Sequence, residues 1–219
     1  MSFRFDSFLF DLDGTLLDTH QDMGNALNII LDNHGRPPLP LETIRPFVSK
    51  GGLVMICSAF KCKPESEQAT ALRHELLDIY LQAISHHTAL FPGMDSILEK
   101  IENSGRKWGI VTNKPGFLTE PLLRELQLHK RVGCVVSGDT LAERKPHPAP
   151  LLYACKQITS SPDRTIYIGD DERDVQAGRR AGMTTLAAAW GYIVEQDDPN
   201  LWNADGVIQQ PQEIAAWLD

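Results

Sequence analysis

Residues 8–19 read Phe-Leu-Phe-Asp-Leu-Asp-Gly-Thr-Leu-Leu-Asp-Thr, an apolar run that ends in two carboxylates and a Gly-Thr turn. Because side chains alternate along a strand, Asp11 and Asp13 point to the same side, and Gly14 allows a sharp turn without a Cβ in the way. Two carboxylates this close repel each other, so a cation must neutralise them or one must hold a proton. The pattern indicates a reactive site at a strand tip; a solvated, Asp-rich turn is the alternative.

Three later segments favour the reactive site. One apolar run ends in Thr112 and Asn113, Lys145 is followed by a proline, and a third run leads into Gly169-Asp170-Asp171-Glu172-Arg173-Asp174. Each follows a strand-like segment, and side chains at the carboxyl ends of parallel strands converge on one crevice. We therefore expect a nucleophile, an anion-binding group, a cation and metal ligands to share one site.

These four motifs, in this order, resemble those of the haloacid dehalogenase-like hydrolase superfamily. The matching residues are Asp11-Leu12-Asp13-Gly14-Thr15, Thr112, Lys145 and the segment from Gly169 to Asp174. The resemblance covers nearly the whole chain. It implies a Rossmann-like parallel sheet with helices on both faces and a small helical cap inserted after the first strand.

Apolar periodicity predicts the same α/β architecture. Beyond residue 90 helical and extended patterns alternate, with helices at 94–103, 117–126, 149–158, 175–181 and 211–218 and strands at 107–112, 133–137, 165–168, 184–188 and 206–208. The preceding block shows only helical patterns, at 20–34, 41–48, 52–60 and 65–85. Consecutive helices cannot continue a sheet, so we predict a core domain of residues 1–16 and 90–219 and a cap domain of residues 17–89.

Composition limits the partners. The 219 residues carry a net charge of −8, which disfavours nucleic acid because phosphate backbones need clustered Lys and Arg. We see no apolar run of membrane-spanning length and no room for a cleavable signal before the first strand. The four cysteines are scattered, as in proteins with reduced thiols. We expect a cytoplasmic monomer or weak homodimer that binds no membrane or nucleic acid.

The resemblance also implies a mechanism. Asp11 would attack the phosphorus of a phosphate monoester and form an aspartyl-phosphate, while Asp13 would move the protons. Mg²⁺ suits these oxygen ligands. It would bind the carboxylates of Asp11 and Asp170 and the backbone carbonyl of Asp13, with Asp171 and Asp174 one layer further from the ion.

Other residues would hold the phosphoryl group. Thr112, Asn113 and the backbone N–H groups near Leu12 and Asp13 can donate hydrogen bonds to it. Lys145 would take part in catalysis as a positive charge beside both the phosphate and the nucleophile Asp11.

Substrate choice is expected to lie in the cap. Arg45 and Lys50 flank Gly51 and Gly52, whose backbone N–H groups precede a helix and could bind an anionic or hydroxylated leaving group. A plain loop between cap helices is the alternative.

The predicted activity is Mg²⁺-dependent hydrolysis of a small phosphate ester, because the resemblance is closer to phosphoglycolate phosphatases. Residues 111–115 and 191–205 also resemble the N-acetylmuramic acid 6-phosphate phosphatases of cell-wall recycling. A phosphoglucomutase-like phosphotransferase would share every core residue, and a non-catalytic binding module remains the alternative from a different class.

Overall fold

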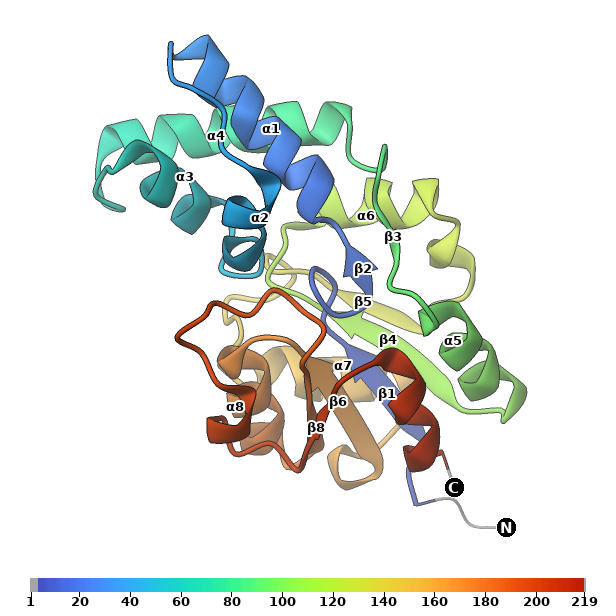
Figure 1. Ribbon diagram of the computed structural model, residues 1–219. Helices are drawn as coiled ribbons and strands as arrows, with labels where there is room; N and C mark the ends of the chain where they lie inside the picture. Colours follow the sequence, from blue (N-terminus) through green and yellow to red (C-terminus); the bar gives the residue numbers. More distant parts are fainter. Residues whose placement is uncertain (1–3, 219) are drawn as a thin grey trace.

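A six-stranded parallel sheet forms the centre of the protein, of which the computed structural model describes residues 4–218 (Figure 1). Its strands, in spatial order, are β5 (Cys134–Val136), β4 (Lys107–Val111), β1 (Ser7–Phe10), β6 (Thr165–Gly169), β7 (Thr184–Ala188) and β8 (Gly206–Ile208). Every residue of β1 is buried, as expected for a central parallel strand covered on both faces. Asp11 therefore leaves the sheet at the middle of its carboxyl edge.

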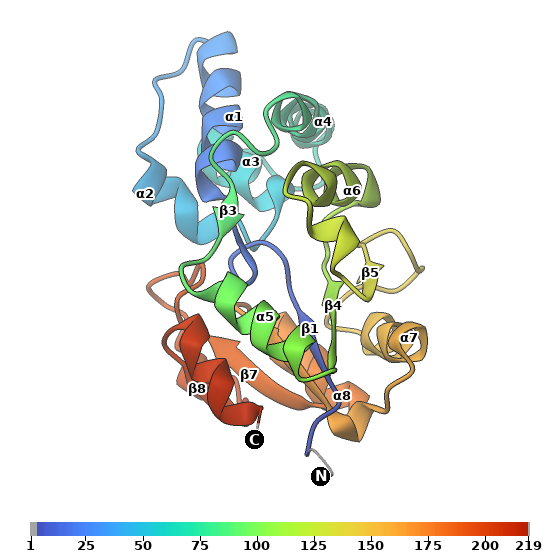
Figure 2. The ribbon, with the colours of Figure 1, turned by 90° about the vertical axis from the view of Figure 1, so that its right-hand side faces the viewer.

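Helices cover both faces of the sheet. Phe8 and Phe10 of β1 belong to the same apolar cluster as residues of α5 (Met94–Asn103) and α6 (Gly116–Glu125), whereas Leu9 packs with α7 (Ala149–Ile158) and α8 (Glu172–Ala181). Figure 2 shows α5 and α7 on opposite sides of β1 and β4. The alternation of side chains along β1 thus separates two layers, and the predicted fold class is confirmed.

A second helical layer lies over the carboxyl edge of the sheet (Figure 1). It contains α1 (His20–Asn33), α2 (Leu41–Ile44), α3 (Gly52–Phe60) and α4 (Glu67–Gln82), in which α4 packs against α1 and α3. Two short strands, β2 (Leu17–Asp18) and β3 (Ala89–Leu90), pair antiparallel where the chain enters and leaves this layer. The division at residues 17 and 89 stays a prediction, and this strand pair supports it.

Most predicted elements are present, with informative differences at their ends. The expectation that the cap block holds no strand was wrong at its borders, because two-residue strands leave no periodic pattern. The helix predicted over 41–48 ends at Ile44 and continues as a 3₁₀ turn (Arg45–Phe47), because Pro46 lacks a backbone N–H. The predicted final helix is likewise a 3₁₀ helix (Pro211–Trp217). Further 3₁₀ turns are Leu128–Lys130, Pro162–Arg164 and Pro199–Leu201.

No described helix is both long and apolar enough to cross a membrane.

Candidate active site

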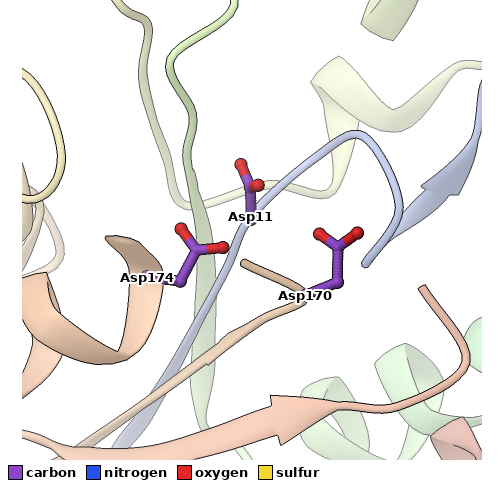
Figure 3. Close-up of side chains that lie close together, drawn as sticks. All are labelled: Asp11, Asp170 and Asp174. Carbon is purple, nitrogen blue, oxygen red and sulfur yellow. The ribbon is translucent and has the colours of Figure 1, made fainter. Parts of the chain in front are cut away.

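Three buried aspartates meet at the carboxyl edge of the sheet (Figure 3). Asp11 follows β1, Asp170 follows β6 and Asp174 lies in the first turn of α8, with one carboxylate oxygen of each within 4.8 Å of the others. The Asp11 backbone N–H donates to the Ile168 carbonyl at 2.9 Å, which holds the ends of the two strands side by side. Oxygen donors of this kind suit a hard cation such as Mg²⁺.

The charges of this cluster are unfavourable without a cation. Burial and the neighbouring carboxylates raise the pKa of Asp11 to about 7 and that of Asp170 to about 8. The backbone N–H of Leu12 hydrogen-bonds to the Asp11 carboxylate and opposes the rise. A divalent cation would relieve the repulsion, so the residues present fit a metal ion.

Asp171 and Asp174 were both predicted to lie one layer further from the metal ion, but they occupy different surroundings. Asp171 caps α8 and pairs with Arg173 at 2.7 Å and Lys50 at 3.0 Å. Although burial opposes it, the Arg173 contacts lower the pKa of Asp171 to about 2. Asp174 instead turns back to the end of β6, where a Cβ on Gly169 would lie 2.3 Å from the Asp174 Cβ. Asp174 thus lies in the carboxylate cluster itself, closer than the sequence analysis expected.

Lys145 is the buried cation beside this cluster. Its Nζ lies 2.8 Å from Asp11 Oδ1, 2.7 Å from Asp174 Oδ1 and 2.8 Å from Tyr167 Oη. Although burial disfavours its charge, the two carboxylates raise the pKa of Lys145, so the side chain stays protonated. Lys145 was predicted beside the nucleophile from its motif, whereas Tyr167 was not predicted, because its sequence pattern is that of an ordinary core residue of a strand.

The two polar residues after β4 differ in what they leave for a ligand. Asn113 donates from Nδ2 to the Lys145 carbonyl and accepts from the Lys145 N–H, both at 3.1 Å, so its side chain supports the lysine loop. Thr112 Oγ1 accepts a hydrogen bond from the Lys114 N–H at 3.1 Å, which leaves its hydroxyl proton to donate. Thr112 therefore fits the phosphate-binding role better than Asn113.

Asp13 is held by two donors. Its Oδ1 accepts from Thr19 Oγ1 at 2.7 Å and from Lys114 Nζ at 2.9 Å. Lys114 also donates to the hydroxyl of Tyr80, on α4, at 3.1 Å. Burial raises the pKa of Tyr80 to about 12, so this hydroxyl stays neutral. The sequence analysis did not find Tyr80, because a single tyrosine on an amphipathic helix carries no recognisable motif.

A cavity of about 530 Å³ lies between the sheet edge and the helical layer, and Asp11, Asp13, Thr112 and Lys145 all line it. Ser49 closes part of the boundary, since its hydroxyl contacts the Asp13 carbonyl at 3.0 Å and Asp170 Oδ2 at 2.8 Å. No sequence pattern pointed to Ser49.

The four predicted specificity residues are only partly brought to this cavity. Lys50, Gly51 and Gly52 line it, but Lys50 is also paired with Asp171 and with Asp197. Arg45 does not line it: its guanidinium donates to the Trp190 carbonyl at 3.0 Å and lies 4.9 Å from the centre of the Tyr192 ring.

Comparisons with known proteins agree with this geometry. A family model described as haloacid dehalogenase-like hydrolase matches residues 8–188. The chain is 44% identical over 212 residues to a phosphoglycolate phosphatase of Xanthomonas campestris pv. campestris (strain 8004), covering 95% of this chain and 96% of the relative. It is 39% identical over 216 residues to an N-acetylmuramic acid 6-phosphate phosphatase of Pseudomonas putida, covering 99% and 97%. A crystal structure of a predicted phosphoglycolate phosphatase from Haemophilus somnus 129PT superposes with a TM-score of 0.86 at 22% identity, covering 99% of each chain.

The chain therefore belongs to the haloacid dehalogenase-like hydrolase family. Within that family it is a phosphatase, a hydrolase of phosphoric monoesters.

Proposed function

We propose that this phosphatase requires Mg²⁺ and acts through an aspartyl-phosphate on Asp11. The observation that carries the proposal is the position of Asp11, which contacts Lys145 at 2.8 Å and has Asp170 and Asp174 within 4.8 Å. A carboxylate nucleophile repels a phosphate dianion, so it needs cations on several sides. The carboxylates of Asp11 and Asp170, the Asp13 carbonyl and, from its position, Asp174 would hold the ion, which would offset that repulsion.

The residues of the chain supply the remaining chemistry. Lys145, the Thr112 hydroxyl and the Leu12 N–H would bind the phosphoryl oxygens while an Asp11 oxygen forms a bond to phosphorus. The bond from phosphorus to the leaving oxygen then breaks, and Asp13 donates a proton to that oxygen. Asp13 next removes a proton from water, the water oxygen attacks phosphorus, and the Asp11 carboxylate is released.

The proposed substrate is a small phosphorylated acid of the phosphoglycolate type, supported by relatives with 44% identity. One observation also favours the larger N-acetylmuramic acid 6-phosphate. The volume of the cavity, about 530 Å³, lies in the range of pockets that enclose drug-sized ligands. It is well above the volume that a two-carbon acid would fill. Both compounds carry a phosphate ester and a carboxylate.

A panel of esters tests this proposal. Phosphate release and kcat/KM would be measured for phosphoglycolate, N-acetylmuramic acid 6-phosphate, glucose 6-phosphate and an aryl phosphate. EDTA should abolish turnover and Mg²⁺ restore it, whereas Ca²⁺ should bind yet support little turnover because its larger, looser shell misplaces the reactants. Activity after exhaustive chelation would remove the ion from the mechanism, and sugar-phosphate isomerisation without phosphate release would indicate a mutase.

We further propose that the enzyme works in the cytoplasm as a monomer or weak homodimer without nucleic-acid or membrane partners. The net charge of −8 supports the absence of nucleic-acid partners, because binding to a phosphate backbone needs clustered positive charge.

A further inference from the structure

Six basic residues line the active-site cavity, and they fall into two groups. Four of them are paired with an aspartate within 3.0 Å: Lys50, Lys114, Lys145 and Arg173. The other two, Arg73 and Arg144, make no ion pair and no side-chain hydrogen bond within residues 4–218. Arg73 is half-buried and Arg144 is exposed, so both side chains are accessible to a ligand in the cavity.

The two arginines come from different layers of the protein. Arg73 lies on α4 of the helical layer, three residues after Thr70 and four before Leu77, and all three line the cavity. This spacing places them on one face of the helix. Arg144 precedes Lys145 in the loop above the sheet. A ligand that fills the cavity would therefore meet a guanidinium from each layer.

The phosphoryl group does not need these arginines. Lys145, together with the cation that the carboxylate cluster would hold, would offset its charge at the sheet edge. A guanidinium presents several N–H donors in a plane, which match the two oxygens of a carboxylate, and it pairs with such an anion more specifically than an ammonium does. Two guanidinium groups without an acidic partner, in the same cavity as the proposed phosphate site, fit the binding of a second anion.

We propose that Arg73 and Arg144 form a subsite for a carboxylate that the substrate carries in addition to its phosphate ester. This inference rests on the proposed phosphatase function and its phosphorylated-acid substrate, and it assigns the residues that bind the carboxylate of that substrate. A short acid such as phosphoglycolate and a bulky sugar acid such as N-acetylmuramic acid 6-phosphate share this chemistry. The subsite replaces Arg45, which faces Trp190 and Tyr192, as the source of substrate discrimination.

Two pairs of esters that differ by the carboxylated group test the subsite. Phosphoglycolate would be compared with ethyl phosphate, and N-acetylmuramic acid 6-phosphate with N-acetylglucosamine 6-phosphate. The kcat/KM of each would be measured for the wild type, Arg73→Gln and Arg144→Gln, because glutamine removes the charge but keeps much of the side chain. Arg124→Gln is the matched control, since Arg124 is an exposed arginine of α6 outside the cavity.

The wild type should prefer the carboxylated member of at least one pair, and that pair identifies the natural source of the carboxylate. Arg73→Gln and Arg144→Gln should each reduce this preference about tenfold or more, as expected for a lost charge-assisted hydrogen bond, and Arg124→Gln should leave it unchanged. Equal losses on both members of the pair, or a wild type that turns over an aryl phosphate but prefers neither carboxylated ester, would overturn the subsite. A wild type inactive on every ester, the aryl phosphate included, would instead refute the phosphatase function.

Discussion

Single side chains decide how the two aspartates with proposed catalytic roles differ. Asp11 points into the carboxylate cluster beside Lys145, whereas Asp13 accepts hydrogen bonds from Thr19 and Lys114. The contacts of Asp11 suit a nucleophile that must face phosphorus. Those of Asp13 suit a group that must hold a fixed position while it transfers protons. Sequence alternation alone could predict that both point to one side of the strand, but not that they have different partners.

Lys114 should act as a positioning residue for Asp13. Lys114→Met removes the 2.9 Å contact with Asp13 and the 3.1 Å contact with Tyr80. We expect the rate of the first step, phosphoryl transfer to Asp11 measured as release of the leaving group in a single turnover, to fall about tenfold for an alkyl phosphate, whose leaving group needs a proton. The same rate should fall much less for dinitrophenyl phosphate, whose leaving group does not need one. Tyr80→Phe keeps the Lys114 contact with Asp13 and should have a smaller effect. Equal losses on both substrates for Lys114→Met would show a purely structural role.

At the scale of elements, the turn after β1 brings the sheet edge and the helical layer together. Gly14 has φ +84°, and a Cβ there would lie 2.1 Å from Asp170 Oδ2 and 2.7 Å from Ser49 Oγ. The turn therefore needs glycine both for its conformation and for the space that Asp170 occupies.

Comparing Gly14→Ala with Gly105→Ala separates the effect of the positive φ from the effect of the space that Asp170 occupies. Gly105 also has a positive φ, +75°, but nothing lies within 4 Å of a Cβ built on it. Gly105→Ala should lose about 1 to 2 kcal/mol of unfolding free energy and keep its activity. Gly14→Ala should lose more stability and need at least about tenfold more Mg²⁺ for half-maximal activity, because Asp170 is displaced. Matching stability and Mg²⁺ dependence in the two variants would contradict this reading of the turn.

The sequence predicted the elements and the motif residues better than the contacts between layers. Long apolar periods gave α3, α5 and α7 their correct ends, and residues at strand ends pointed to the sheet edge. The contacts of Ser49 and Tyr80, and the position of Arg73 at the cavity, arise only when the helical layer is placed over the sheet. Arg45 was expected beside the substrate because it is close in sequence to Gly51 and Gly52, but the 3₁₀ turn directs it to Trp190.

At the scale of the whole molecule, the carboxylate cluster links stability to pH and to the metal. In the folded protein Asp11 and Asp170 hold their protons up to about pH 7 and 8, against an ordinary aspartate pKa of 3.8. Between about pH 4 and pH 8, Asp11 and Asp170 therefore bind more protons in the folded chain than in the unfolded chain. The contribution of these two groups to the stability of the metal-free protein therefore falls as pH rises from about 4 to about 8.

Magnesium should reverse this trend, because it would bind the ionised carboxylates. We expect the increase in Tm on adding saturating Mg²⁺ to be small near pH 5 and to grow toward pH 8, measured by thermal unfolding against EDTA-treated protein. In Asp11→Asn the pH dependence of this increase should be weaker. A Mg²⁺-induced increase in Tm that is the same at every pH would contradict the proposed ligand set.

The central claim is that Asp11 carries the phosphoryl group and Asp13 is needed to remove it. The most direct measurement is the pre-steady-state release of dinitrophenol from dinitrophenyl phosphate by Asp13→Asn, because this leaving group departs without a proton. The account predicts a burst of about one equivalent per enzyme, then turnover at least about a hundredfold slower than wild type, and no burst from the Asp11→Asn/Asp13→Asn double variant. A linear time course from folded, Mg²⁺-binding Asp13→Asn, or a burst that survives in the double variant, would contradict it.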